Sequence, residues 1–205
     1  MRTTVAGVLL AAGEGSRFGR PKALVELNGQ TLAERGVGLL RAGGADPILV
    51  VTGAVRVEFE GTVTVDNPRW RTGMGSSLQA ALRALAAAAR TEVGSGTEIG
   101  AVVVALADQP LVGAEAVARL IAAYRDGASV AVAAYHGQPR NPVLLAREHW
   151  PEVIATATGD QGARTFLRTR PELVTRVECG DTGRPDDIDT PADLARITAE
   201  AAEGG

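Results

Sequence analysis

Residues 9–22 read LLAAGEGSRFGRPK. An apolar run from Val5 to Leu10 leads directly into this segment, which is rich in glycine and carries two cations. Glycine lets backbone amides approach an anion closely and tolerates positive φ, and the charges of Arg17 and Lys22 suit a triphosphate. Ligands of open α/β sheets bind at the carboxyl ends of the strands. The segment therefore predicts a phosphate-binding loop after the first strand of an α/β fold.

Two better-known phosphate loops do not fit this segment. The order G-x-x-x-x-G-K-[ST] is absent, because Lys22 follows a proline and precedes Ala23. A dinucleotide fingerprint G-x-G-x-x-G that starts at Gly13 would need a third glycine where Phe18 stands. The alternative to a phosphate loop is an ordinary glycine-rich turn with solvated cations.

The composition narrows the class of protein. A length of 205 residues suits one domain spanning residues 1–205. Hydrophobic residues make up 45% of the chain but aromatic residues only 3%, so the core must be aliphatic, as in buried parallel strands. A net charge of -3 gives no reason to expect nucleic acid or a membrane as partner. With a single cysteine, Cys179, and no run of membrane-spanning length, we expect a soluble cytoplasmic protein without disulfides.

Strand and helix signals alternate along the chain. Apolar or β-branched runs predict strands, and apolar residues spaced three and four apart predict helices. This alternation predicts a three-layer α/β/α sandwich with a mostly parallel, Rossmann-like sheet. The expected strands are residues 5–10, 48–52, 63–65, 101–106, 129–134, 142–145 and 173–177. The expected helices are residues 31–42, one capped by Ser76 or Ser77, one after Pro110, residues 161–168 and one starting at Pro191.

Two acidic positions suggest a metal site. Asp108 follows the apolar run 101–106, at the same edge of the sheet as the glycine-rich loop, where a carboxylate is suited to hold Mg²⁺. A helix cap or Asx turn is the alternative there. The segment DDID at residues 186–189 places three carboxylates together, and these repel one another unless a cation relieves them. One Mg²⁺ would recruit Asp108 and one member of this cluster, with a solvated acidic turn as the alternative.

Polar groups also precede the helix that is expected to begin at Ser76 or Ser77. In DNPRWRTGMGSSL, residues 66–78, the Asn67 side chain offers donors and acceptors to a base edge. Two glycines there permit close approach of an anion to the helix start. Trp70 would anchor the loop or stack on a ring. Residues 137–145 and 159–164 are turn-rich and polar, and they read either as an acceptor pocket or lid or as ordinary surface turns.

Taken in order, these motifs resemble the MobA-like NTP transferases, the family of the molybdenum-cofactor cytidylyl- and guanylyltransferases. The matching stretches are LLAAGEGSRFGRPK, NPRWRTGMGSSL, LADQP, PRNPVLL, GDQGAR and DIDTPADL, which together run through most of the chain. The resemblance implies a fold of the nucleotide-diphospho-sugar transferase type. It also implies a reaction in which a nucleoside triphosphate and a phosphorylated acceptor form a nucleotidyl product and pyrophosphate.

The resemblance assigns roles to individual residues. Arg17, Lys22 and Asp108 would be catalytic, and Asp108 and Asp189 would hold Mg²⁺, with Asp187 as the alternative to Asp189. The nucleotide would contact Leu10, Ala11, Ala12, Gly13, Arg17, Lys22, Gly53, Asn67, Ser77 and Asp108. The acceptor would contact Gln109, Asn141, Pro142 and Gly162.

The resemblance also bears on the substrates. Guanylyltransferases of the family tend to carry two glycines where this chain has Ala12 and Gly13, and a methyl group under the base favours CTP. The PRNPVLL and GDQGAR stretches favour a phosphorylated pterin, molybdopterin, as acceptor, with a transient contact to a molybdoenzyme. The alternatives are an NAD(P)H-dependent oxidoreductase of the nicotine-blue reductase type and a non-catalytic molybdenum-cofactor chaperone.

Overall fold

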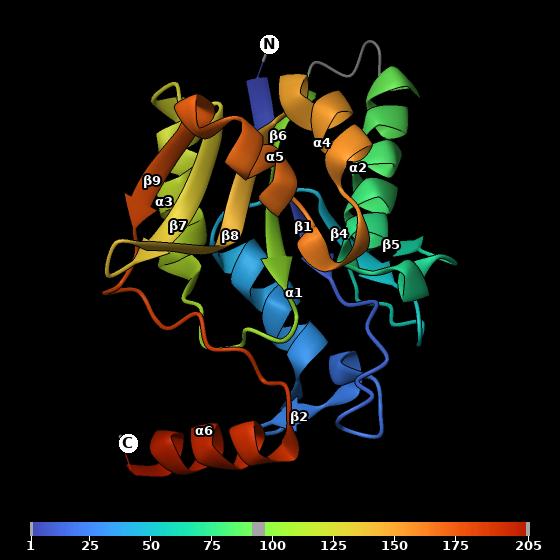
Figure 1. The fold of residues 1–205 in the computed structure, drawn as a ribbon, viewed down its shortest axis with the longest axis vertical. Coiled ribbons are helices and arrows are strands. Elements are labelled where there is room, and N and C mark those ends of the chain that lie inside the picture. The colour runs from blue at the N-terminus through green and yellow to red at the C-terminus, as the bar shows by residue number, and fades with distance from the viewer. Residues whose placement is uncertain (1, 92–96, 204–205) are drawn as a thin grey trace.

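The computed structural model describes residues 2–91 and 97–203, in which one seven-stranded sheet lies between two layers of helices (Figure 1). The strand order is β5-β4-β1-β6-β8-β7-β9. Neighbouring strands of this sheet are parallel, except that β8 is antiparallel to both β6 and β7. The strands are β1 (Arg2–Leu10), β4 (Ile48–Thr52), β5 (Thr62–Asp66), β6 (Thr97–Leu106), β7 (Val130–Tyr135), β8 (Gln138–Ala146) and β9 (Val174–Glu178). The prediction of a three-layer, mostly parallel α/β fold is confirmed.

Helices cover both faces of the sheet, which explains why some strands are buried at every position. Strand β4 is buried at all five positions and β7 at all six. The helices are α1 (Leu32–Ala42), α2 (Met74–Thr91), α3 (Ala114–Arg125), α4 (Trp150–Thr156), α5 (Arg164–Thr169) and α6 (Pro191–Glu203). Leu78, Leu82, Trp150 and Phe166 of α2, α4 and α5 pack on one face. Val37, Leu40, Val117 and Leu120 of α1 and α3 pack on the other.

A third apolar cluster lies outside these two layers. It joins the short hairpin of β2 (Glu26–Leu27) and β3 (Gln30–Thr31) to the C-terminal helix α6. Its buried members are Val25, Leu27, Leu32, Ile188 and Ile197. Figure 1 shows α6 and β2 together beyond the ends of the central strands. This cluster therefore holds the acidic segment before α6 close to the segment that follows the glycine-rich loop.

Some element boundaries differ from the predicted ones. Helix α2 begins at Met74, so Ser76 and Ser77 lie in its first turn and do not cap it. The hydroxyl of Ser76 donates to the carbonyls of Arg69 and Gly73, and both serines accept from the Asn67 amide. These bonds brace the loop before the helix, whereas a cap would have served the helix N–H groups.

Two other segments were also misjudged. Residues 138–146 form the hairpin strand β8, which confirms the strand expected over residues 142–145, but residues 138–141 belong to this strand and not to a turn. The helix expected over residues 161–168 begins at Arg164, after a 3-10 turn at Gly159–Gln161. The β2–β3 hairpin was not predicted. None of the helices in residues 2–91 and 97–203 is long and apolar enough to span a membrane.

Candidate active site

The glycine-rich loop leaves the end of β1 and returns to the protein at Lys22. Gly15 has φ +62°, and a Cβ there would lie 3.0 Å from the Lys22 amide nitrogen and closer still to the Arg20 carbonyl. A side chain at this position would push Lys22 away, so glycine is required. At its start the loop is held by Ala11, whose amide donates to the Val51 carbonyl over 3.0 Å. The loop thus has a fixed origin and a fixed return point.

Lys22 joins two acidic residues that are distant in sequence. Its Nζ lies 2.9 Å from Oδ2 of Asp108 and 2.5 Å from Oδ1 of Asp189. The lysine side chain is only 20% exposed. Burial by itself lowers the pKa of Lys22, but the charges and hydrogen bonds of Asp108 and Asp189 outweigh it and raise the pKa above its usual value. The ammonium is therefore firmly charged.

Backbone hydrogen bonds bring the two acids to this point. Asp108 lies two residues after Leu106, the last residue of β6, and between them the Ala107 amide donates to the Leu10 carbonyl at the end of β1. The Ile188 amide donates to the Asp108 carbonyl over 2.8 Å, so Asp189 is tied to the same sheet edge. Thr190 and Asp193 exchange hydrogen bonds at the start of α6, so Thr190 caps this helix.

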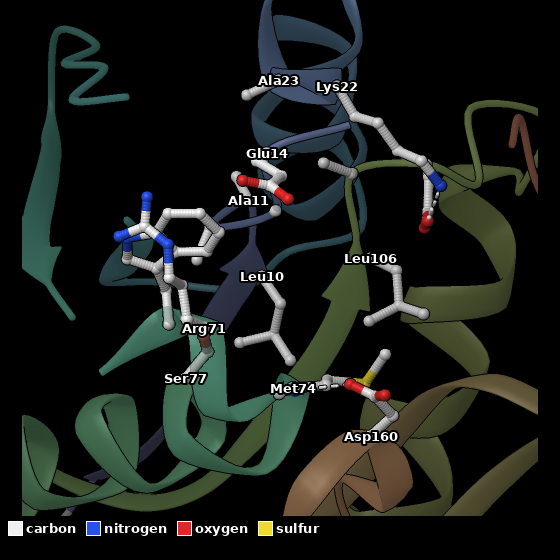
Figure 2. A pocket seen from close by; sticks show the side chains of 16 residues that line it. Leu10, Ala11, Glu14, Lys22, Ala23, Arg71, Met74, Ser77, Leu106 and Asp160 are labelled. Carbon is white, nitrogen blue, oxygen red and sulfur yellow. Dashed lines mark hydrogen bonds and ion pairs between the residues drawn. The ribbon is translucent and has the colours of Figure 1, made fainter. Parts of the chain in front are cut away.

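A pocket of about 480 Å³ opens beside this cluster (Figure 2). Backbone of the glycine-rich loop forms one wall, and the first turn of α2 forms another. The pocket brings together many of the residues predicted to bind the nucleotide: Leu10, Ala11, Ala12, Gly13, Lys22, Ser77 and Asp108. The N-terminus of an 18-residue helix beside a glycine-rich loop makes this a suitable place for an anion.

Three residues predicted to bind the nucleotide do not line the pocket. Asn67 is 3% exposed, and its amide donates to Ser76 and Ser77 while its oxygen accepts from the Arg69 amide. The polar atoms of Asn67 are thus all used inside the protein, and a contact of Asn67 with a base edge stays a prediction. Gly53 lies under Trp70: a Cβ at Gly53 would be 2.5 Å from that of Trp70.

The remaining prediction concerns Arg17. Its side chain is 71% exposed, and Nη1 lies 3.6 Å from Oδ2 of Asp189. Arg17 therefore lies beside the acidic cluster but outside the pocket wall, and its role as a phosphate ligand stays a prediction.

The residues predicted to bind the acceptor are scattered. Gln109 is 5% exposed, and its amide donates to Asp187 over 2.9 Å, so it braces the acidic segment and lines a different cavity. Asn141 and Pro142 lie within β8, outside the pocket wall. A Cβ at Gly162 would lie 3.1 Å from the Met74 sulfur, so Gly162 packs on the start of α2. Contact of these residues with an acceptor stays a prediction.

The pocket also contains residues that the sequence did not single out. Glu14, Arg71, Met74 and Asp160 line it, and Oδ1 of Asp160 accepts weakly from the Met74 amide at 3.4 Å. All four lie in motifs that were recognised, LLAAGEGSRFGRPK, NPRWRTGMGSSL and GDQGAR, which could have indicated them. Within its motif, however, no local signal distinguished Arg71 from a surface arginine.

The donor set fits a hard divalent cation. In residues 2–91 and 97–203 no group of three His, Cys, Asp or Glu side chains could hold a metal. Mg²⁺, however, needs only one or two carboxylates together with waters and substrate phosphates. Asp108 and Asp189 aim one oxygen each at a single cation, which here is the Lys22 ammonium. Partial burial and the charge of Asp108 raise the pKa of the neighbouring Asp187, a sign of excess negative charge.

Known proteins resemble this chain at the level of sequence and of fold. Residues 7–175 match the MobA-like NTP transferase domain. Nicotine blue oxidoreductase of Paenarthrobacter nicotinovorans is 37% identical over 207 positions, which cover 94% of this chain and 96% of that protein. A probable molybdenum cofactor guanylyltransferase of Opitutus terrae is 41% identical over 87 positions, covering 42% of this chain and 43% of that protein.

Solved structures agree with these matches. The Mycobacterium sp. strain JC1 homolog of Mycobacterium tuberculosis Rv0371c has a TM-score of 0.79 and 30% identity, with full coverage of both chains. Rv0371c in complex with manganese has a TM-score of 0.71 and 25% identity, covering 98% of this chain and 100% of that one. By the match over residues 7–175 and the similarity to full-length relatives, the chain belongs to the family of MobA-like NTP transferase domains.

Proposed function

We propose that this protein is a metal-dependent nucleotidyltransferase that transfers CMP from CTP to a phosphorylated pterin, molybdopterin, and releases pyrophosphate. The observation that carries the proposal is the Lys22 ammonium, which joins Asp108 and Asp189 at the edge of a pocket walled by the glycine-rich loop. A triphosphate needs both a cation of the protein and a carboxylate pair for Mg²⁺ or Mn²⁺. This pocket offers both.

The residues act by position and charge. Backbone amides of the glycine-rich loop bind phosphate oxygens, and Lys22 and Arg17 oppose the charge that develops on the α-phosphate and on leaving pyrophosphate. Asp108 and Asp189 would hold the metal ion, which supplies further charge neutralisation on the phosphates. A phosphate oxygen of the acceptor is itself the nucleophile, so no side-chain nucleophile is required.

The choice of base is proposed from Ala12. This residue is 6% exposed and lines the pocket, and its carbonyl accepts from the Ala54 amide over 3.1 Å, so its position is fixed. The methyl group of Ala12 reduces the space for the base, so that a pyrimidine fits better than a purine. This supports CTP over GTP. The related O. terrae protein carries the name of a guanylyltransferase, so the base must be measured.

The acceptor is proposed from the name of that relative, which concerns the molybdenum cofactor. A product of this kind would pass to a molybdoenzyme in a transient contact. A second candidate function is an NAD(P)H-dependent oxidoreductase, because the P. nicotinovorans relative, similar over nearly the whole chain, is named nicotine blue oxidoreductase. Against it, the loop after β1 has Phe18 where the dinucleotide fingerprint needs glycine.

The test is pyrophosphate release from each of the four NTPs with Mg²⁺, with and without molybdopterin, run beside NADH oxidation on the same preparation. The proposal expects release with CTP that requires both metal and acceptor and is lost in Lys22→Met. Oxidation of NADH without pyrophosphate release would assign the second function. Tight binding of nucleotide without any turnover would point to a chaperone.

A further inference from the structure

Arg71 lies in the wall of the pocket, and Figure 2 shows it on the opposite side from Lys22. Its guanidinium carbon lies 4.3 Å from the centre of the Trp70 ring, in cation–π contact. If Lys22 and Asp108 mark the end of the pocket where the triphosphate lies, the Arg71 end is left for the base. This step rests on the proposed function.

The Trp70–Arg71 pair is held in place from below. Trp70 packs directly on Gly53, where a Cβ would lie 2.5 Å from the Trp70 Cβ and 2.8 Å from the Ala12 carbonyl oxygen. The 3-10 turn Trp70–Thr72 is fixed at both ends, because the Trp70 amide donates to Asn67 and the Gly73 amide donates to Trp70. Arg71 is thus presented from a rigid support, as a recognition residue requires.

The guanidinium has no acidic partner within the described part of the chain. No ion pair or hydrogen bond joins Arg71 to any of those residues, and the stacking on Trp70 is its one side-chain contact of this kind. Arg119 shows the contrast, since its fork is filled by both carboxylate oxygens of Asp181 at 2.6 and 2.7 Å. Arg71 therefore keeps its donors free at a pocket whose other cation is already paired.

We propose that Arg71 recognises the base of the nucleotide through two adjacent acceptors on one edge, and so selects cytosine against uracil. A guanidinium presents parallel N–H donors in a fixed fork. The O2 and N3 atoms of cytosine both accept hydrogen bonds. N3 of uracil carries a hydrogen, so its N–H donor would point at an N–H donor of the guanidinium. Guanine also presents an acceptor pair, O6 and N7. Guanine is disfavoured because Ala12 narrows the space for the base, and uracil is disfavoured because it does not offer Arg71 two adjacent acceptors.

The magnitude follows from other bidentate contacts between a side chain and a base. Such a contact discriminates by roughly tenfold to a hundredfold against the wrong base. Stacking of the base on the guanidinium would add affinity but would not separate cytosine from uracil, because both rings present a face. The ratio of the two dissociation constants therefore reports the hydrogen bonds alone.

The experiment measures the dissociation constants of CTP and UTP by calorimetry, with Mg²⁺, on the full chain. The variants are Arg71→Ala, Arg71→Lys and the control Arg125→Ala, in which an exposed arginine at the end of α3, away from the pocket wall, is removed. Wild type is expected to prefer CTP by about tenfold or more. In Arg71→Ala the preference for CTP is expected to fall to about twofold or less, through loss of CTP affinity. Arg71→Lys should behave similarly, because lysine lacks the two parallel N–H donors of the guanidinium. Arg125→Ala should keep the wild-type ratio of the two dissociation constants.

The outcomes separate the two proposals. If wild type prefers CTP and Arg71→Ala keeps that preference, the inference on Arg71 is overturned while the proposed function stands. If Arg71→Ala weakens the binding of CTP and of UTP equally, the inference is also overturned. That result would mean that Arg71 contributes charge or structural support and does not distinguish the bases. If wild type binds no nucleotide, the proposed function falls with it. Melting curves of each variant confirm that it is folded.

Discussion

Lys22 and a metal ion should compete for the same two carboxylate oxygens, and Lys22→Met tests this competition. The Lys22 ammonium lies 2.9 Å from Asp108 and 2.5 Å from Asp189, where a cation bound by both acids would also lie. Removing the ammonium frees both oxygens without leaving a hole, since methionine has nearly the same length and volume. We expect the variant to bind Mn²⁺ more tightly than wild type when no nucleotide is present.

The size of the gain follows from the two contacts. At an effective dielectric constant of about 20, a charge pair 3 Å apart is worth about 5 kcal/mol before solvation is counted. The acids are 27% and 46% exposed, so most of that value is cancelled by lost hydration. A net value of about 1 kcal/mol per contact remains, or about 2 kcal/mol in all, which is about thirtyfold in the dissociation constant.

The assay is Mn²⁺ titration followed by electron paramagnetic resonance, which counts free metal directly. Turnover with CTP and acceptor should fall by about a hundredfold or more in the same variant, because the proposed role of Lys22 is also to stabilise the transition state. Opposite signs of the two effects exclude a merely unfolded protein. Arg17→Met is the matched control: with a 71% exposed side chain at 3.6 Å, it should change Mn²⁺ affinity by about twofold at most. Unchanged or weaker Mn²⁺ binding in Lys22→Met would refute the competition.

Four further substitutions test the site and the fold that supports it. Asp108→Asn should abolish most metal-dependent turnover, about a hundredfold or more, and remove the response to Mn²⁺ titration; an unaltered titration would contradict a ligand role. Glu178 accepts from three backbone N–H groups, which lower its pKa, so its stabilisation is present above its usual pKa of 4.5 and is lost as the pH falls through the folded value. The melting temperature of Glu178→Gln should therefore lie below wild type at pH 7 and approach it at pH 3, and a constant difference would count against this reading. Gly53→Ala should cost about 1–3 kcal/mol of unfolding free energy and weaken nucleotide binding, because its Cβ would displace Trp70. Gly38→Ala in α1, where nothing lies within 4 Å of the added Cβ, should instead add up to about 1 kcal/mol in urea unfolding.

The order of elements was predictable because its signals are local. Buried parallel strands are apolar over four to ten residues, and glycine or proline marks their ends. The β2–β3 hairpin escaped because each strand has two residues, too few for any pattern to appear. Its turn was visible in principle, since Asn28 and Gly29, with φ of 53° and 77°, form the Asn-Gly pair typical of two-residue hairpins.

The site was predictable as far as it depends on strand ends. Lys22 ends the loop after β1, and Asp108 follows β6, the neighbouring parallel strand, so parallel topology predicts that these two residues lie at the same end of the sheet. Asn67 could not be assigned in this way, because the fate of its amide depends on where α2 begins. With the helix starting at Met74, the hydroxyls of Ser76 and Ser77 turn back to Asn67 and use both of its N–H donors. Hydrogen-bonding capacity in a sequence does not say whether the partner is a substrate or a neighbour.

The choice between Asp187 and Asp189 illustrates the same point at the metal site. The sequence offers two carboxylates on either side of Ile188, and the chemistry of each is identical. Ile188 is fully buried in the third apolar cluster, and its amide is bound to the Asp108 carbonyl, so the segment has one possible placement. In that placement Asp189 reaches Lys22 and Asp187 reaches the Gln109 amide. The apolar contacts of Ile188 and α6 thus determine which acid reaches Lys22, although these contacts lie outside the wall of the pocket.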